Sequence, residues 1–203
     1  MRSCKTAVPE LRLGVLAIQG GFEAHVRVLR HLGADVREVR SAAEMEDLDG
    51  LVIPGGESTT IVKGIETAEL EEPIREHHEA GGTVFGTCAG MIVCDDSNLG
   101  LIDATATRNA FGRQLQSFEA DLEVKGMGGE PLRAIFIRAP WVERYGPDVE
   151  VLASYEGHPV AIREGRVLAC AFHPELTDDP RLHAYFMAMT TSARDQAREE
   201  AEA

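Results

Sequence analysis

Runs of apolar residues alternate with helical patterns in the first half of the chain. The run at residues 13–18 is nearly continuous, and shorter strand patterns follow at 35–39, 48–53 and 83–85. A nearly continuous apolar run is typical of a strand that is buried on both faces of a parallel sheet. We therefore expect these four stretches to be strands of one central sheet.

Helical patterns lie between these strands. Val26, Leu29 and Leu32 recur at the spacing of one helix face within a helix predicted over residues 23–32, and a second helix is predicted over residues 70–80. The alternation of strand and helix predicts an α/β fold with a mostly parallel central sheet flanked by helices on both faces, similar to the flavodoxin-like arrangement.

The second half contains shorter strand patterns that are separated by glycine-containing turns. We expect some of these strands to pair antiparallel, because a short turn joins two strands that run in opposite directions. One amphipathic helix is expected after Pro180. The strand patterns lie at residues 120–124, 132–137, 149–153, 159–162 and 167–171.

The chain of 203 residues is long enough to bury a sizeable core within a single domain. We place that domain at residues 12–192. An extension at residues 1–11 precedes it, and an acidic tail at residues 193–203 follows it.

Three glycine-containing loops follow predicted strands, at residues 19–21, 54–60 and 86–90. Ligands of open parallel sheets gather beyond the carboxyl ends of the strands, so these loops mark the predicted binding site. The second loop lacks the Gly-Lys-Ser/Thr ending of a P-loop, and no Gly-x-Gly-x-x-Gly follows the first strand. Nucleotide binding is therefore disfavoured.

The third loop places a cysteine at a sharp turn from a strand into a helix. Its sequence is Gly-Thr-Cys-Ala-Gly, with Cys88 at the apex and Gly86 and Gly90 on either side. Small flanking residues are needed where a nucleophile occupies a strained turn between a strand and a helix. The pentapeptide alone leaves open whether Cys88 is a nucleophile or a buried structural cysteine.

A second chemical motif, His-Pro-Glu, follows the last predicted strand. His173 at the strand end and Glu175 two residues later could lie on the same side, so that the carboxylate orients the imidazole. Taken alone, His173 could equally be a surface histidine beside a proline turn. Together with the turn at Cys88, the motif favours a base-activated thiol held by a third group.

Composition limits the partners and the compartment. The formal net charge of -14 argues against nonspecific nucleic-acid binding. The four cysteines include no Cys-x-x-Cys pair, so no zinc site or disulfide framework is indicated, and a reducing cytoplasm fits best. We expect neither a metal ion nor a cofactor, and the run at residues 13–18 is too short for a signal peptide or a membrane span. The acidic, lysine-poor composition suits a salty cytoplasm or reflects genomic base composition.

Seven motifs occur in order along residues 12–190. They lie at residues 17–20, 54–60, 86–90, 108–114, 117–119, 136–140 and 172–176. Together they resemble the class I glutamine amidotransferases, and most closely the glutaminase subunits of pyridoxal 5'-phosphate synthase.

The resemblance implies hydrolysis of L-glutamine to L-glutamate and ammonia through a cysteine thioester. Cys88 would be the nucleophile, His173 would take its proton, and Glu175 would hold His173. The implied glutamine-binding residues are Gly55, Gly56, Glu57, Ser58, Arg108, Ile137 and Arg138. The implied oxyanion hole is formed by the backbone at Gln19, Gly20 and Ala89.

The implied partner is a barrel-shaped synthase subunit that uses the ammonia to build pyridoxal 5'-phosphate (vitamin B6) in a hetero-oligomer, with no role for nucleic acid or a membrane. Two features depart from the family pattern: a short segment at residues 93–100 and the amino-terminal extension. One alternative is a glutaminase of another class I amidotransferase, which the motifs at residues 54–60 and 108–114 disfavour. The other is a non-catalytic thiol-sensing protein on the same fold, which the His-Pro-Glu motif disfavours.

Overall fold

The computed structural model describes residues 10–111 and 117–202, so most of the expected amino-terminal extension and part of the motif at residues 108–114 lie outside the described residues. The strands are β1 (Arg12–Leu16), β2 (Asp35–Val39), β3 (Gly50–Ile53), β4 (Thr83–Thr87), β5 (Ala104–Thr107), β6 (Ser117–Leu122), β7 (Leu132–Ile137), β8 (Trp141–Tyr145), β9 (Glu150–Tyr155), β10 (His158–Glu164) and β11 (Val167–Cys170). The helices are α1 (Phe22–His31), α2 (Ser58–Thr67), α3 (Glu71–Glu79), α4 (Ala89–Cys94) and α5 (Arg181–Glu202), with short helical turns η1 (Ala42–Met45) and η2 (Pro174–Leu176).

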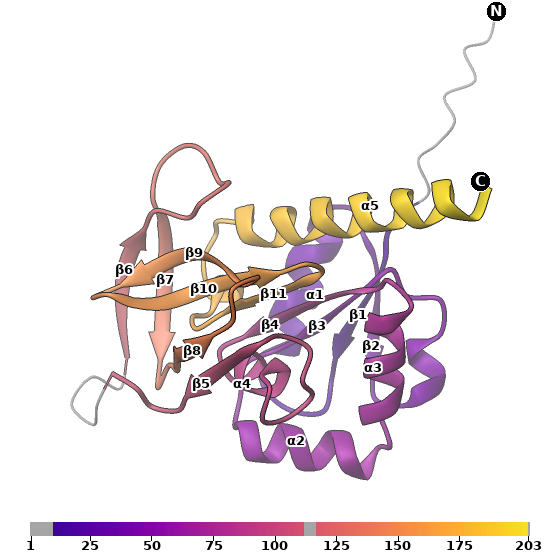
Figure 1. The fold of residues 1–203 in the computed structure, drawn as a ribbon, viewed down its shortest axis with the longest axis horizontal. Helices are drawn as coiled ribbons and strands as arrows, with labels where there is room; N and C mark the ends of the chain where they lie inside the picture. Colours follow the sequence, from indigo (N-terminus) through magenta and orange to yellow (C-terminus); the bar gives the residue numbers. More distant parts are fainter. Residues whose placement is uncertain (1–9, 112–116, 203) are drawn as a thin grey trace, which may run out of the picture.

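A seven-stranded sheet forms the centre of the molecule, in the order β2-β1-β3-β4-β11-β10-β9 (Figure 1). The first five strands in this order run parallel. The strand β10 pairs antiparallel with both β11 and β9, and two smaller antiparallel pairs, β5–β8 and β6–β7, lie beside this end of the sheet. The predicted α/β fold, with antiparallel strands in the second half, is confirmed.

Different helices cover the two faces of the central sheet. Phe85 and Gly86 of β4 point to opposite faces, because side chains alternate along a strand. The Phe85 ring lies 5.5 Å from the ring of Phe186 in α5 and 6.4 Å from that of His25 in α1, so α1 and α5 share one face. On the other face, Gly86 lies against Gly90 of α4, and α2 packs beside α4.

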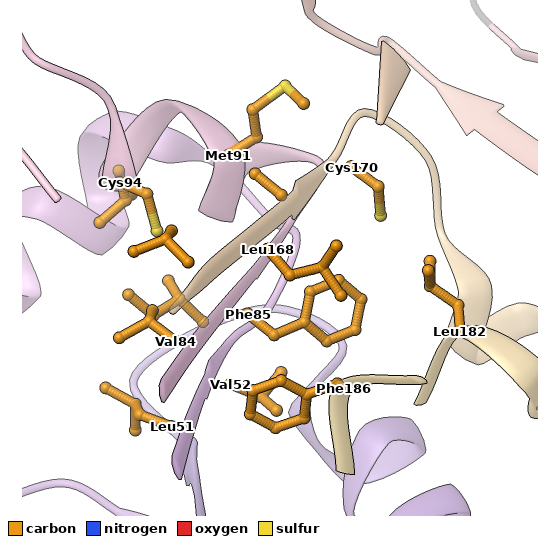
Figure 2. Close-up of a cluster of buried hydrophobic side chains, with 14 of the residues drawn as sticks. Leu51, Val52, Val84, Phe85, Met91, Cys94, Leu168, Cys170, Leu182 and Phe186 are labelled. Atoms are coloured by element: carbon orange, nitrogen blue, oxygen red, sulfur yellow. The ribbon is translucent and has the colours of Figure 1, made fainter. Parts of the chain in front are cut away.

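The core follows from this arrangement. Figure 2 shows Phe85, Phe186 and Leu182 packed together on one side of the central strands, with Val84 and Cys94 on the other. All five are buried. Burial of each large apolar side chain stabilises the fold by about 1.5–3 kcal/mol. This core fixes the relative positions of β4 and β11, whose ends lead into the motifs around Cys88 and His173.

The first half contains one helix that the sequence analysis missed. Residues 54–60 were predicted to be a loop, but α2 begins at Ser58. Its first turn contains small polar and β-branched residues, which are typical of loops and strands. The apolar positions Ile61 and Ile65 are four residues apart and both buried, and they carry the helical signal.

Two further differences lie in the second half. The strands β5 and β8 were not predicted; they pair with each other at the edge of the molecule, where their exposed positions are polar. The helix α5 continues to Glu202, through the segment that was expected to be an acidic tail from residue 193. Among the helices of residues 10–111 and 117–202, none is both long enough and apolar enough to cross a membrane.

Candidate active site

Cys88 lies between the end of β4 and the start of α4, at the carboxyl edge of the sheet. Its backbone has φ 50° and ψ -109°. A non-glycine residue with positive φ in such a sparsely populated region costs about 1–3 kcal/mol and is common at active sites. The Cys88 backbone N–H donates a hydrogen bond to the Cys170 carbonyl oxygen at 2.8 Å, which ties the turn to β11. The predicted strand–turn–helix is confirmed.

The two flanking glycines allow the turn to close. A Cβ atom on Gly86 would lie 2.5 Å from the Gly90 carbonyl oxygen, and a Cβ atom on Gly90 would lie 1.9 Å from the Ile53 carbonyl oxygen. In both cases the obstacle is backbone, which cannot move aside as a flexible side chain can. The close approach of α4 to β3 and β4 therefore requires glycine at both positions.

Replacing Gly90 with alanine is expected to lower the free energy of unfolding by about 3 kcal/mol, because the added methyl group forces α4 away from β3. Urea denaturation followed by circular dichroism measures this change. The matched control is Gly128→Ala, whose Cβ atom would meet no heavy atom within 4 Å; we expect it to change stability by less than about 0.5 kcal/mol. Equal stabilities of the two variants would contradict the packing described for Gly90.

His173 and Glu175 lie beside Cys88 because β4 and β11 are parallel neighbours and end at the same edge. His173 Nδ1 and Glu175 Oε1 are 2.7 Å apart. The side chains of His173 and Cys88 both adjoin Gly55, and the interaction with Cys88 contributes to the raised pKa of His173. The Cys88 thiol itself donates to the Ile137 carbonyl oxygen at 3.8 Å. The His173 backbone N–H donates to the Ile135 carbonyl oxygen at 2.8 Å, which fixes the strand end that carries the ring. The three side chains thus form a continuous Cys–His–Glu array.

The electrostatics of this array favour a cationic imidazole. Burial lowers the pKa of His173, but hydrogen bonds to Cys88 and Glu175 and the charges of both side chains outweigh it and raise the pKa to about 10. Burial raises the pKa of Glu175, but the hydrogen bond to His173 and nearby histidine charges leave it below its ordinary value. The raised pKa of His173 stabilises the fold below about pH 6.5, and this contribution is lost as pH rises through about 10.

A pocket of about 300 Å³ opens in front of the sulfur atom. This volume is at the lower end of the range for small-molecule sites. In the part of the chain that the structure describes, His, Cys, Asp and Glu side chains form no group of three or more suited to a metal ion. The lining residues are Gln19, Gly56, Glu57, Ser58, Cys88, Ala89, Ile92, Arg108, Asn109, Ile137, Arg138, Pro140 and His173.

Most of the predicted site residues line this pocket, but three do not. Glu175 lies behind the His173 ring, as expected for the group that holds it. Gly55 lies beneath His173 and Cys88: a Cβ atom there would be 2.6 Å from His173 Cε1 and 3.0 Å from Cys88 Cβ. Gly20 has φ 96°, and a Cβ atom there would lie 1.8 Å from the Gly55 carbonyl oxygen. These two glycines permit close packing at the floor of the site.

The Glu57 carboxylate caps the amino terminus of α2. It accepts hydrogen bonds from the backbone N–H groups of Thr59 and Thr60, at 3.1 and 2.7 Å, and from the Thr60 hydroxyl at 2.7 Å. The Thr60 hydroxyl and these two N–H groups lower the pKa of Glu57 to about 2. The Glu57 backbone N–H donates to Gln19 Oε1 at 2.9 Å, and Arg108 donates to the Thr59 hydroxyl at 2.9 Å. These hydrogen bonds join the loops that carry Gln19, Glu57 and Arg108 at the rim of the pocket.

The pocket also contains three residues that sequence analysis did not select as site residues. Ile92, Asn109 and Pro140 line it. Asn109 has φ 49°, a conformation in which asparagine is several-fold enriched among non-glycine residues. The signal for Asn109 was its position next to Arg108 in a motif, whereas nothing local distinguished Ile92 from a core residue. Residues 112–114 of that motif lie outside the described residues.

Comparison with known sequences gives a consistent family. The model of the SNO glutamine amidotransferase family matches residues 15–192. Pyridoxal 5'-phosphate synthase subunit PdxT of Acidothermus cellulolyticus is 52% identical over 195 residues, covering 89% of this chain and 94% of that protein. The subunit of the same name from Shouchella clausii is 48% identical over 186 residues, covering 88% and 95% of the two chains.

Solved structures agree with the sequence relatives. A crystal structure of a glutamine amidotransferase superposes with a TM-score of 0.84 at 46% identity, covering 88% of this chain and 98% of that chain. PurLQS from Thermotoga maritima superposes with a TM-score of 0.67 at 16% identity, covering 91% and 97% of the two chains, which is a likeness of fold.

Proposed function

The chain belongs to the SNO glutamine amidotransferase family, and from this membership we propose that it hydrolyses L-glutamine with Cys88, His173 and Glu175 as its catalytic residues. It is a glutaminase subunit of pyridoxal 5'-phosphate synthase and supplies ammonia for vitamin B6 biosynthesis. The observation that carries the residue assignment is that Cys88 and His173 line one open pocket and that His173 Nδ1 lies 2.7 Å from Glu175 Oε1 behind it.

The first half of the reaction forms a thioester. Cys88 Sγ attacks the carboxamide carbon of glutamine while His173 holds the proton that leaves the thiol. His173 then delivers this proton to the nitrogen as the carbon–nitrogen bond breaks, and ammonia departs. Glu175 keeps the ring oriented and stabilises its cationic form through the 2.7 Å contact.

The second half releases glutamate. A water molecule attacks the thioester carbon, His173 accepts a proton from that water, and the carbon–sulfur bond breaks. The sulfur regains a proton from His173, so the enzyme returns to its starting state. Each half passes through a tetrahedral intermediate that carries negative charge on the former carbonyl oxygen.

Backbone amides are proposed to stabilise that oxygen. Ala89 begins α4 directly after the nucleophile and lines the pocket, and Gln19 lines it from the loop after β1. Gly20 adjoins Gln19 and allows that loop to lie against Gly55. Donors aimed at the developing charge typically contribute about 10²–10³-fold in rate. Gln19, Gly20 and Ala89 are therefore the proposed oxyanion-hole residues.

The remaining lining residues are proposed to hold the amino-acid end of glutamine. Arg108 and Arg138 offer guanidinium groups, which suit a carboxylate. The Glu57 carboxylate is ionised and suits an ammonium group. Gly55, Gly56, Ser58 and Ile137 complete the proposed glutamine-binding set.

The partner of this subunit is a synthase that consumes the ammonia, and we propose that it is barrel-shaped and forms a hetero-oligomer with this chain in the cytoplasm. We further propose that residues 12–192 form the glutaminase domain, a span that the family match at residues 15–192 supports. The amino-terminal segment is an extension to that domain.

Glutamate release tests the function. We expect L-glutamine to be converted into equimolar glutamate and ammonia by the purified chain mixed with its synthase, and more slowly by the chain alone. Enzymatic assays of both products measure this. Absence of glutamate under both conditions would overturn the proposed activity, and full activity without the synthase would contradict the dependence on a partner.

A further inference from the structure

Two buried histidines lie behind the catalytic array, on the side away from the pocket. His25 of α1 and His183 of α5 are both fully buried. His25 Nε2 lies 3.3 Å from Glu175 Oε2, the carboxylate oxygen that does not face His173. His25 Nδ1 lies 2.9 Å from His183 Nε2. The polar array therefore continues inward from Cys88 through His173, Glu175, His25 and His183.

Both inner imidazoles are neutral. Burial lowers the pKa of His25 to about 4, and burial together with the neighbouring His25 ring lowers the pKa of His183 to about 3. A neutral imidazole carries one N–H donor and one unprotonated acceptor nitrogen. Two protons must therefore be distributed over four ring nitrogens, and only one proton can lie between His25 and His183.

The contacts decide between the two distributions. In one distribution His25 carries its proton on Nδ1, and its unprotonated Nε2 faces the negatively charged Glu175 Oε2. The His25 Nδ1–H then donates to His183 Nε2, so the His183 proton must lie on His183 Nδ1, which has no hydrogen-bond partner. If His183 Nε2–H donates to His25 Nδ1 instead, His25 Nε2–H is free to donate to Glu175 Oε2. The unpartnered His183 Nδ1 is then an acceptor, which costs less than an orphaned N–H donor.

We propose that His25 is a positioning residue of the active site, whose Nε2–H holds the inner oxygen of Glu175, and that His183 fixes the required tautomer of His25. The proposal rests on the proposed glutaminase function. Glu175 Oε2 is buried and lacks a well-aligned hydrogen bond, so an N–H on His25 Nε2, 3.3 Å away, supplies its nearest charge–dipole contact from α1. Together with His173 Nδ1–H on Oε1, this contact orients the carboxylate toward the catalytic ring.

His25 also contacts the strand that leads to the nucleophile. Its Nε2 lies 3.2 Å from the Thr87 hydroxyl oxygen, directly before Cys88 in the chain. The same hydroxyl accepts a hydrogen bond from the Gly55 backbone N–H at 3.1 Å. One imidazole thus borders the catalytic carboxylate, the turn and the loop under the site. It does not line the pocket, so it acts through other residues.

Two substitutions at His25 separate positioning from filling of the core. In His25→Gln the side-chain amide nitrogen can occupy the place of Nε2 and donate to Glu175, whereas His25→Leu fills the space without a donor. We expect His25→Leu to lower kcat for glutamate release by about 10–100-fold, the usual effect of losing an outer partner of a histidine–carboxylate site, while KM changes little. The variant His25→Gln should recover most of this loss. These assays use the chain together with its synthase.

A buried histidine elsewhere provides the control. His77 of α3 is mostly buried, its Nε2 lies 3.3 Å from the Thr83 carbonyl oxygen, and it does not touch the array. We expect His77→Leu to leave kcat within about twofold of wild type. Equal kcat losses in His77→Leu and His25→Leu would reduce the effect to general destabilisation and overturn the positioning role.

The pH profile provides a readout that a packing defect would not move. The titratable groups around Glu175 are His25 and His183 on the inner side, His173 and Cys88 on the pocket side, and Cys170 of β11. Loss of the His25 donor raises the pKa of Glu175, so the acid limb of kcat/KM should move to higher pH in His25→Leu. A lower kcat/KM in His25→Leu whose acid limb stays at the wild-type pH would overturn the proposal.

Nitrogen NMR of wild-type protein with ¹⁵N-labelled histidine tests the tautomer without any substitution. We expect His25 to be neutral with its proton on Nε2, and a proton on Nδ1 would overturn the inference even if the variants failed to fold. Failure of the proposed glutaminase function would give a different result from failure of the His25 proposal, because wild-type protein with its synthase would then release no glutamate. Active wild type together with an equally active His25→Leu would overturn only the role of His25.

Discussion

Replacing Cys88 with alanine is expected to lower glutamate release by about 10⁴-fold or more, because residues 10–111 and 117–202 offer no other accessible thiol that can form the thioester. Loss of a catalytic nucleophile removes the covalent route altogether and leaves only binding and oxyanion stabilisation. The other described cysteines, Cys94 and Cys170, are fully buried, and burial raises the pKa of both thiols well above its ordinary value. Neither can take over the reaction.

The control for this prediction is Cys94→Ala, at the end of the helix α4 that follows Cys88. Cys94 packs against the Gly86 side of β4 and lies away from the pocket lining, so its loss should affect stability more than turnover. Glutamate release by both variants is measured in the presence of the synthase. Turnover by Cys88→Ala near that of wild type would show that the nucleophile has been misassigned.

The same variant separates catalysis from assembly. Cys88 is 6% exposed and lies at the floor of the pocket, so its truncation removes one sulfur atom without altering the outer surface. We expect Cys88→Ala to bind the synthase with unchanged affinity in sedimentation or pull-down measurements. Loss of binding would mean that the substitution disturbs the fold of the turn.

The parallel part of the fold was predictable because four of its five strands, all except the edge strand β2, are buried on both faces. Such strands read as apolar runs, and the run that ends before Gly86 also predicts where the turn lies. The strands β5 and β8 gave no comparable signal. Thr105 pairs with Arg144, nearly forty residues away, and both carry polar side chains, so neither strand can be identified without its partner.

The part of the candidate active site around Cys88 and His173 was predictable, whereas the buried histidines behind it were not. Small residues around Cys88 and the short His-Pro-Glu motif report local geometry, which a sequence displays directly. His25 occupies the buried face of α1 next to Val26 and one turn before Leu29, where the apolar pattern predicts a core position. Its partner His183 lies 158 residues away, and only the packing of α1 and α5 on one sheet face brings them together.

The substitution Glu175→Gln is expected to lower kcat by about 10⁴-fold, although glutamine has nearly the shape of glutamate. In the proposed arrangement the carboxylate presents one oxygen to His173 and the other to His25, which requires two acceptor oxygens. An amide has one oxygen and one NH₂ group, so it can satisfy only one of the two donors. Replacement of a triad carboxylate by its amide causes a loss of about this size through the wrong histidine tautomer.

The control for this substitution is Glu123→Gln, which changes the formal charge by the same amount on an exposed side chain. It should leave kcat within about twofold of wild type. The pKa of His173 should fall in Glu175→Gln, since the carboxylate charge and its hydrogen bond both raise that pKa in the wild type. A kcat for Glu175→Gln within about tenfold of wild type would contradict the role of the carboxylate.

The inner histidine determines which way the new amide points. His25 Nε2–H selects the amide oxygen, which turns the NH₂ group toward His173 Nδ1. That nitrogen must then stay unprotonated, so His173 cannot become the cation that takes up the thiol proton. In the double variant His25→Leu/Glu175→Gln this constraint is absent, and the amide can rotate so that its oxygen accepts from Nδ1. We therefore expect the double variant to be no slower than Glu175→Gln, whereas independent effects would multiply. If the losses in kcat of the two single variants multiply in the double variant, His25 does not act through the carboxylate.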